Sequence, residues 1–345
     1  MKPSLPVLLL VCVSVLTGRA DLPPLIPRVV LFGNPDRAAP QLSPDGSRLA
    51  WLASDTNNVL QVWVQTVGKE DQKIVTADKK RGIRQYFWAK DNHTLLYLQD
   101  SDGDENFHVY GVDLTSGNVR DLTPFQGVRA TVNDLNPDFP NELLVSLNLR
   151  NRELFDVYRL NLKNGALDLD TENPGDVADW GTDSKFRVRL AQVTPPEGGA
   201  EIRLRADDKA PWKTFLKVGP EEILEALGFT ADGQSLHLKS SIGRDTAAVV
   251  EKNISTGAEK VLASSDEVDA GGVLIHPRKY IVEAVAFSPG RSSWKVIDAA
   301  VKEDLAGISK LNDGDFFIAN RTEADDIWLV GFQADRAPGR YYRWD

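Results

Sequence analysis

The stretch of sequence that decides the fold is Leu42–Gly46 (LSPDG), which is followed two residues later by Leu49–Leu52 (LAWL). Pro has a fixed φ, and Asp and Gly accept the backbone angles of tight turns, so the first stretch predicts a turn. Apolar residues on either side of such a turn are typical of paired strands. The pattern therefore predicts a β-hairpin.

This hairpin pattern recurs along the chain. The copies are at Trp88–Asn92, Asn136–Asp138, Trp180–Asp183 and Phe229–Gly233, with weaker ones at Ile275–Arg278 and Leu311–Gly314. Their turn positions are 46, 47, 45, 49 and 46 residues apart, with a last step of 35. A two-sheet sandwich would also give many short strands, but it would not give this regular step. A doubly wound α/β sheet is disfavoured as well, because only Pro220–Leu227 is predicted to be helical.

A second hairpin follows several copies of the first, as in Val109–Leu114, which turns at Ser116–Gly117 into Val119–Leu122. Four short strands in about 46 residues are typical of one propeller blade. The sequence therefore predicts an all-β fold, a seven-bladed β-propeller with four-stranded antiparallel blades, over residues 41–345 after a lead-in segment at 21–40. Because the chain ends inside the last repeat, we expect the last blade to lack its final strand.

The composition is that of a folded, acidic protein. The chain has 345 residues, of which 42% are hydrophobic and 26% charged, and its formal net charge is −10. Eight Trp, seven Tyr and thirteen Phe can form a substantial core, which argues against a disordered chain. The scattered Lys and Arg form no basic face, so we expect no nucleic-acid partner. The single Cys and four His exclude a disulfide framework and a Cys-based zinc site, and we predict neither a metal nor a cofactor.

The N-terminus predicts export. Lys2 is followed by the apolar run Leu5–Leu16 and by Thr17–Ala20, whose small residues suit cleavage after Ala20. An apolar run of about 12 residues is too short for a membrane span, which takes roughly 20. We therefore predict a signal peptide at 1–20 and a periplasmic or extracellular mature protein without a membrane anchor; a buried strand or a retained anchor is the alternative. Three N-x-[ST] sequons, which matter only in a glycosylating host, are at Asn92, Asn253 and Asn320.

The sequence shows no complete serine-peptidase site. The nearest match to the nucleophile motif G-x-S-x-G is Gly307–Leu311, which fails at its last position. All four histidines precede this serine, whereas the α/β-hydrolase order places the histidine after it. These are His93, His108, His237 and His276, which we interpret as surface or packing residues. A propeller lactonase or glycosidase would need convergent carboxylates or metal ligands, for which the sequence has no signature.

Two oppositely charged clusters are the candidates for binding. The acidic segment Asp100–Glu105 closes a predicted hairpin, and its spacing does not fit an EF-hand. The basic segment Lys79–Arg84 precedes the next predicted strand. A solvated surface is the simplest interpretation of both; the alternatives are an anionic lip for a cationic group such as a peptide N-terminus, and an interdomain salt bridge or carboxylate clamp. The candidates for substrate or partner binding are Arg84, Asp102, Asp104 and Glu105.

Six stretches of the sequence carry a family resemblance: Ile26–Pro35, Ser43–Gly46, Thr76–Arg84, Asp102–His108, Asp313–Phe316 and Asp325–Val330. They resemble the prolyl oligopeptidase family of serine peptidases, above all its acylaminoacyl-peptidase and dipeptidyl-aminopeptidase-like bacterial branch. The Ser-Pro-Asp-Gly turn alone is common in periplasmic propellers, whereas the longer strings are more specific. The resemblance spans essentially the whole mature chain.

The resemblance implies a peptidase about twice this length, in which a seven-bladed propeller caps a C-terminal α/β-hydrolase domain with the catalytic Ser, Asp and His. In that family the propeller restricts access, so that only short or unfolded peptides reach the serine. No catalytic residue of the family maps onto this chain. The expected function is therefore gating and substrate filtering for an exported peptidase whose hydrolase domain is missing or separately encoded, and the chain alone is predicted to be inactive. The alternative is a stand-alone periplasmic propeller of the TolB or WD40 type that binds a protein or peptide partner.

Overall fold

The computed structural model describes residues 24–345. The predicted signal peptide at 1–20 lies outside these residues. The described chain forms two units, which divide between Asn34 and Pro35. The first unit contains the short helix α1 (Arg28–Phe32), and the strands, beginning with β1 at Ala38, are in the second. Within residues 24–345, no helix combines the length and the apolar character that crossing a membrane requires.

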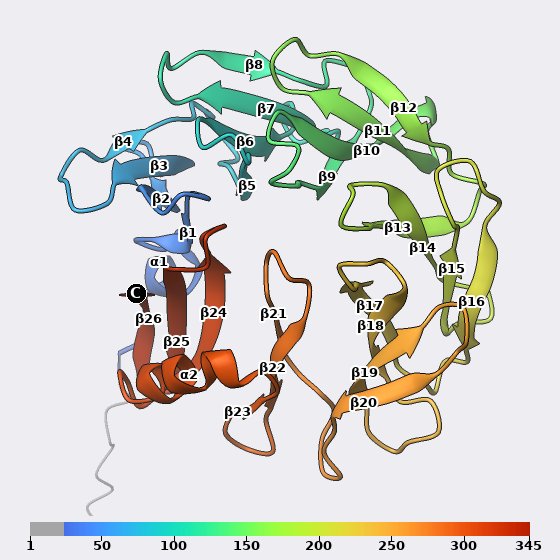
Figure 1. Ribbon diagram of the computed structural model, residues 1–345. Coiled ribbons are helices and arrows are strands. Elements are labelled where there is room, and N and C mark those ends of the chain that lie inside the picture. The colour runs from blue at the N-terminus through green and yellow to red at the C-terminus, as the bar shows by residue number, and fades with distance from the viewer. Residues whose placement is uncertain (1–23) are drawn as a thin grey trace, which may run out of the picture. The chain divides into compact units, whose positions relative to one another are not determined.

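Pro35–Asp345 forms seven antiparallel sheets that are arranged as the blades of a ring (Figure 1). Blade 1 consists of β1 (Ala38–Leu42), β2 (Arg48–Ser54), β3 (Leu60–Thr66) and β4 (Lys73–Ile74). Blade 2 consists of β5 (Gln85–Trp88), β6 (Thr94–Gln99), β7 (His108–Asp113) and β8 (Val119–Asp121). Blade 3 consists of β9 (Ala130–Asp134), β10 (Glu142–Asn151), β11 (Leu154–Asn161) and β12 (Leu167–Thr171).

Blade 4 consists of β13 (Val177–Thr182), β14 (Val188–Val193), β15 (Ala200–Leu204) and β16 (Lys213–Val218). Blade 5 consists of β17 (Leu224–Phe229), β18 (Ser235–Ser240), β19 (Ala248–Asn253) and β20 (Glu259–Ala263). Blade 6 has three strands, β21 (Val273–Ile275), β22 (Val282–Phe287) and β23 (Ser293–Val296), and so has blade 7, β24 (Asp315–Arg321), β25 (Trp328–Ala334) and β26 (Ala337–Trp344). The predicted seven-bladed propeller is confirmed, whereas a three-stranded blade 6 was not expected.

Helical structure lies elsewhere than the sequence predicts. After β23 the chain forms a 3-10 turn, η1 (Ala299–Val301), and the helix α2 (Lys302–Ile308) instead of a fourth strand. Leu305 and Ile308 follow Val301 at helical spacing and are buried with it against blades 6 and 7. The helix predicted at Pro220–Leu227 is wrong, because its second half is the start of β17 and pairs with β18.

The turn between the first two strands of a blade, here called the AB turn, has a recurring backbone conformation. In six blades one residue of this turn has a positive φ; these residues are Gly46, Asn92, Phe186, Gly233, Tyr280 and Asp325. The Asp of the motif fixes the turn, as in blade 1, where the Asp45 carboxylate accepts hydrogen bonds from the Ser43 hydroxyl and the Ser47 N–H. The turn motif that recurs in the sequence therefore lies in the AB turn, which is why the motif repeats once per blade.

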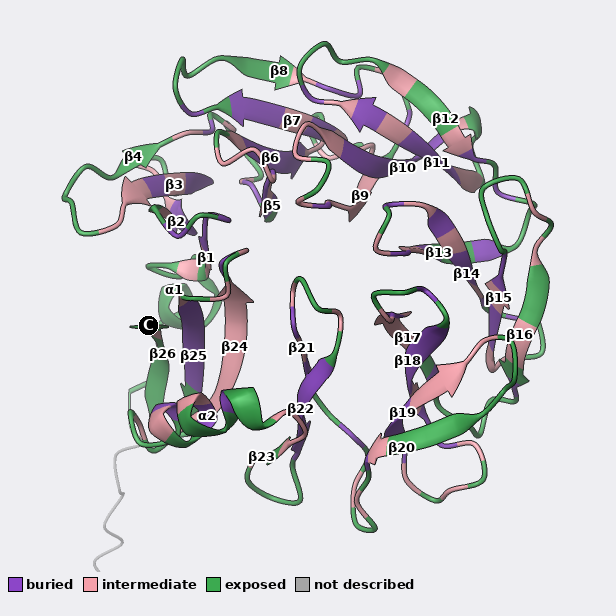
Figure 2. Ribbon diagram, viewed as in Figure 1, coloured by how far each residue is buried: buried purple, intermediate pink, exposed green. Residues whose placement is uncertain are grey.

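The hydrophobic core lies within and between neighbouring blades. Between blades 2 and 3, for example, Leu96 and Val109 pack in one cluster with Leu143 and Leu160, and all four are fully buried. The middle strands of the blades are buried, whereas outer strands such as β8, β16 and β20 are largely exposed (Figure 2). This placement explains why middle strands such as β6 and β22 are almost continuously apolar.

Side chains also join successive blades at their AB turns. Arg48, at the start of β2, donates to the carbonyl of Asn92 in blade 2 at 3.0 Å. Arg189 of β14 donates in the same way to the carbonyl of Gly233 in blade 5 at 3.2 Å. Each bond ties a second strand to the next turn, so the ring is held at its turns as well as by its apolar core.

The ring closes between blades 7 and 1 through the side chain of Asn320. The Leu42 N–H donates to Asn320 Oδ1 at 3.1 Å, and Asn320 Nδ2 donates to the Leu42 carbonyl at 2.9 Å. The Glu323 N–H donates to the Pro44 carbonyl at 2.8 Å. One amide side chain thus gives β1 the pair of hydrogen bonds that a strand would give.

Candidate functional site

The two charged clusters identified in the sequence meet at one end of blade 2. Residues 75–84 connect β4 to β5 and residues 100–107 connect β6 to β7, so the antiparallel meander brings both connections to the same end. Lys80 Nζ lies 2.7 Å from Asp102 Oδ1, and Arg81 Nε lies 3.7 Å from Asp100 Oδ2. The hydrogen bond from Lys80 lowers the pKa of Asp102. Two ion pairs therefore join the two clusters.

The other predicted candidates lie in the same two connections. Arg84 is exposed, and its Nη2 donates to the Arg81 carbonyl at 3.4 Å. Asp104 accepts hydrogen bonds from Asn106, which together with the Ser101 backbone lower its pKa, although desolvation alone would raise it. Glu105 is exposed and has a φ of 59°. Asp102, Asp104 and Glu105 thus share one turn, and Arg84 lies on the neighbouring connection.

A pocket of about 450 Å³ lies between these connections. Its wall includes Asp78, whose carboxylate accepts from Gln99 Nε2 at 2.8 Å, and Tyr110, which stacks on Tyr97 at 5.2 Å between ring centroids. Ammonium, guanidinium and carboxylate groups stand side by side here, so the pocket suits a group that carries both donors and acceptors.

A second pocket, here called the channel pocket, lies in the wall of the central channel that a propeller ring encloses. It has a volume of about 310 Å³ and is lined by the innermost strands β9, β13 and β17 and by the AB turn of blade 6. Its polar lining residues include Asn133, Asp134, Asp179 and His237. Sequence reasoning missed this pocket; the signal was the presence of acidic and amide residues on the first strands of two neighbouring blades.

Asp134 is the half-buried acid of the channel pocket. Its carboxylate accepts hydrogen bonds from the Thr182 hydroxyl and, at 2.8 Å, from the Leu135 N–H. Burial raises the pKa of Asp134, against the effects of these two hydrogen bonds and of the charge on Lys90. Because Lys90 is itself paired with Glu323, Asp134 lacks a dedicated positive partner in the described part of the chain.

His237 and Asn133 bring unsatisfied acceptors to the same pocket. His237 is 2% exposed, and its Nε2 lies 3.0 Å from the carbonyl of Tyr280. A carbonyl only accepts, so Nε2 carries a proton, and the tautomer that has its proton there leaves Nδ1 as an acceptor. Within residues 24–345, neither His237 Nδ1 nor Asn133 Oδ1 has a hydrogen-bond partner. Buried acceptors without donors are rare, because each costs free energy.

The AB turns also form ion pairs across the ring. Arg278 Nη2 lies 2.8 Å from Asp138 Oδ1 and joins the AB turns of blades 6 and 3. Lys90 pairs with Glu323 and joins those of blades 2 and 7. Beside these pairs is a small pocket of about 150 Å³, lined by AB-turn residues of five blades. The turn end of the channel is therefore narrowed by side chains.

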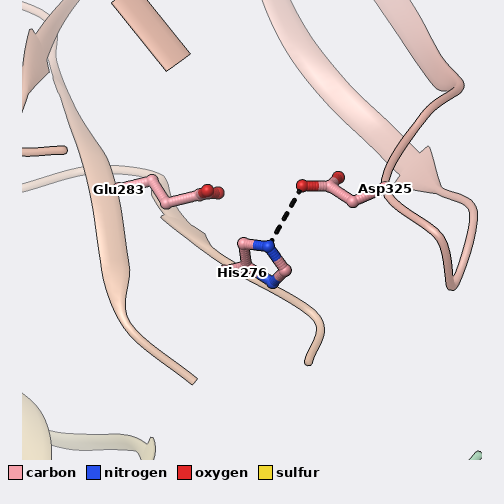
Figure 3. Close-up of side chains that lie close together, drawn as sticks. All are labelled: His276, Glu283 and Asp325. Carbon is pink, nitrogen blue, oxygen red and sulfur yellow. Dashed lines mark ion pairs between the residues drawn. The ribbon is translucent and has the colours of Figure 1, made fainter. Parts of the chain in front are cut away.

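Blades 6 and 7 share a buried cluster of titratable residues, which Figure 3 shows. Ligand-type atoms of His276, Glu283 and Asp325 lie within 4.8 Å of one another, and His276 Nε2 is 3.4 Å from Asp325 Oδ2. Desolvation lowers the pKa of His276, and two backbone N–H groups of its own turn donate to Nδ1 at 3.1 Å. The guanidinium of Arg321 pairs with both carboxylates.

These residue types could ligate a metal, but the geometry favours an internal ion pair. A divalent ion between Glu283 and Asp325 would have to displace the charge of Arg321, whose side chain is 5% exposed. His276 Nε2 lies 3.4 Å from Asp325 Oδ2, so the imidazole edge faces the same carboxylate as the guanidinium. Sequence reasoning missed the cluster, because its members are separated by up to 49 positions and belong to two blades.

The serine of the near-match to the nucleophile motif lies at the end of α2. The Ser309 hydroxyl donates to the Ala306 carbonyl at 3.0 Å. Gly307 lies against the ring of Trp344, where a Cβ atom would come within 2.5 Å of the indole. This glycine and serine therefore serve the packing and the end of the helix.

Two curated relatives are similar to almost the whole chain. Dipeptidyl aminopeptidase BIII from Pseudoxanthomonas mexicana is 39% identical over 324 residues, which are 93% of this chain and 47% of that protein. Dipeptidyl peptidase family member 6 from Caenorhabditis elegans is 24% identical over 99% of this chain and 48% of that protein. No family model matches the chain. The chain therefore spans about half the length of the curated relatives that it matches.

The fold is also that of a solved peptidase propeller. A prolyl endopeptidase structure superposes with a TM-score of 0.66 over 89% of this chain and 48% of that chain, at 11% sequence identity. At this identity the likeness concerns the fold alone. Together with the curated relatives, it confirms the resemblance found in the sequence: the chain is a β-propeller that matches the N-terminal propeller region of dipeptidyl aminopeptidase and prolyl oligopeptidase family members.

Proposed function

We propose that this chain is the non-catalytic propeller of an exported serine peptidase of the prolyl oligopeptidase type, and that it filters which peptides reach an α/β-hydrolase domain. The observation that carries the proposal is the 39% identity to dipeptidyl aminopeptidase BIII over 93% of this chain. That relative continues for about half of its length outside the match. In the proposal, the hydrolase domain is part of the same polypeptide or is encoded separately.

The structure supports this proposal at two places. At the end of blade 2 opposite its AB turn, Arg84 and Glu105 are exposed beside the pair of Lys80 and Asp102. We propose that these charges contact the hydrolase domain or a peptide on its way to it. In the channel, the narrowed turn end and the channel pocket would select what passes by size and charge.

A hydrolysis assay and the coding sequence together test the proposal. The purified chain should not hydrolyse aminoacyl or acyl-aminoacyl chromogenic peptides, because the described part of the chain contains no serine placed against a histidine and an acid. The DNA downstream of the codon for Asp345 should encode a G-x-S-x-G segment followed by Asp and His. Turnover by the chain alone would contradict the proposal. A stop codon followed by an unrelated gene would favour the stand-alone binding propeller.

Export is tested separately. Protein recovered from the periplasm or the medium should begin at Asp21, as N-terminal sequencing would show, because cleavage is predicted after Ala20. Recovery of the intact N-terminus from the cytoplasm would contradict export while leaving the filter function open to the assay above.

A further inference from the structure

The channel pocket has an unusual surplus of hydrogen-bond acceptors. Asp134 and Asp179 supply carboxylates, and His237 Nδ1 and Asn133 Oδ1 supply acceptors that have no donor within residues 24–345. Asp179 is exposed in the pocket, where its carboxylate accepts from Gln192 Nε2 at 3.3 Å. A pocket with this lining is electrostatically prepared for a ligand group that carries positive charge and several donors.

The number of donors decides between the two organic cations found in peptides. An ammonium group has three N–H donors around one nitrogen, whereas a guanidinium has five in a flat fork. The four acceptor groups of the channel pocket belong to three different blades. The separated N–H groups of a guanidinium can therefore reach more of these acceptors than the N–H groups of a single ammonium nitrogen. Trp180 and Tyr280 also line the pocket, and flat guanidinium groups stack on such rings.

The protein itself uses this contact beside the channel pocket. The guanidinium carbon of Arg205 lies 4.6 Å from the ring centroid of Trp212, and that of Arg189 lies 4.9 Å from the ring of Phe229. We propose that the channel pocket is a subsite for the guanidinium of an arginine side chain, with Asp134 and Asp179 as its charge partners. The surrounding atoms cover His237 Nδ1 and Asn133 Oδ1, so these two acceptors meet its remaining N–H groups only when the lining side chains move.

This inference rests on the proposed filter function, since a peptide must pass the channel pocket for the pocket to select it. Under that function, the subsite favours arginine-containing peptides. Lys90 does not fill the role of the missing cation, because it pairs with Glu323 at the turn end.

The test is calorimetric titration of the purified chain with three small probes at millimolar concentration. Nα-acetyl-arginine amide carries the guanidinium, and Nα-acetyl-citrulline amide is its neutral isostere. Triglycine, used as its C-terminal amide, carries an N-terminal ammonium as its only charge. We expect the arginine probe to bind at least about tenfold more tightly than either of the others. Equal binding of the arginine and citrulline probes, or binding of triglycine alone, would overturn the proposal, and so would the absence of binding by the arginine probe.

Two variants locate the binding in the channel pocket. Asp179→Asn removes an exposed carboxylate and Asp134→Asn a half-buried one, and each should weaken the arginine probe by about tenfold or more. Asp168→Asn makes the same change on the exposed outer strand β12 and should leave the affinity unchanged. If Asp134→Asn does not fold, Asp179→Asn still decides, and unchanged affinity in that variant refutes the site.

A spectroscopic readout separates a direct contact from a general charge effect. With ¹⁵N-labelled histidine, Nδ1 of His237 should resonate as an unprotonated acceptor and shift when the arginine probe binds, while His93 in the AB turn of blade 2 should not shift. If the Nδ1 resonance of His237 did not shift at a saturating concentration of the arginine probe, the proposed contact between His237 and the guanidinium would be contradicted. None of these measurements depends on hydrolysis, so their failure refutes the subsite alone, and the filter function is decided by the assay and coding sequence described above.

Discussion

Replacing Asn320 with alanine should loosen the ring at its closure. The substitution removes the two hydrogen bonds, of 3.1 and 2.9 Å, that the amide makes with the backbone of Leu42. A net hydrogen bond contributes about 0.5–1.5 kcal/mol, and a buried backbone group left without a partner costs about 1–3 kcal/mol. Leu42 is only 3% exposed, so water cannot readily replace the amide. We expect a loss of about 2–4 kcal/mol from a total stability on the order of 5–15 kcal/mol.

Urea unfolding followed by tryptophan fluorescence measures this loss, and amide hydrogen exchange at Leu42 locates it. Asn320→Asp keeps the acceptor for the Leu42 N–H but loses the donor, so its loss should be smaller than that of Asn320→Ala. Asn118→Ala, at an exposed turn of blade 2, is the control and should change stability by less than about 0.5 kcal/mol. If Asn320→Ala matched this control and the Leu42 amide stayed protected, the closure would not depend on the amide.

Three further predictions concern the turns and the open edge. Gly233→Ala should lower the free energy of unfolding by about 1–3 kcal/mol, because a Cβ at a φ of 67° is strained and would lie 2.8 Å from Arg189 Nη1. The control is Gly257→Ala, at a φ of 71° with open space around it, which should lower the free energy of unfolding by less in the same urea assay. Hydrogen bonds from Arg187 lower the pKa of Asp183 below its usual 3.8, although burial alone would raise it. Its contribution to stability is therefore present above that pH and lost below it, so Asp183→Asn should flatten the fall in unfolding free energy on acidification. Hydrogen exchange should be faster in β26, the outermost strand of its sheet in the described part of the chain, than in the middle strands β2 and β6; equal protection would mean that the edge is covered.

The blades could be predicted from the sequence because their determinants are local. A turn such as that at Gly46 needs only its own residues to accept a positive φ, and the strands on either side need only apolar residues. The turn of blade 4 shows the limit of this reasoning. Phe186 lies in this turn at a φ of 60°, which large side chains rarely adopt, and it is held there because its ring is fully buried against Phe139 and under the guanidinium of Arg159. Packing between blades fixes the backbone conformation of such a residue, and the local sequence pattern does not reveal that packing.

The candidate sites also differ in how far the sequence alone predicts them. Lys80 and Asp102 were found as two charged clusters because each lies in a short run of like charges, and only their mutual pairing needed the structure. The channel pocket combines residues from four blades. These residues are far apart in the sequence, so they can be recognised as one site only when the arrangement of the blades is known. A polar residue such as Asp134 on an innermost strand is the one trace of the pocket in the sequence.

The strengths of the contacts indicate how a peptide could use the channel if it passes through, as proposed. The pair of Arg278 and Asp138 at the turn end is exposed by 41% and 58%, and such a pair contributes only about 0–1 kcal/mol. The ring closure at Asn320 is worth several times more, and the ion pairs of Arg321 add a buried contact between blades 6 and 7, which is costly to break. Opening a path between blades 7 and 1 therefore costs more free energy than moving the side chains of Arg278 and Asp138 aside at the turn end. Arg278→Ala in the complete peptidase should consequently speed the hydrolysis of bulky peptides without lowering the stability of the ring, whereas Asn320→Ala should lower stability first; a faster reaction in Asn320→Ala alone would place the passage between the blades.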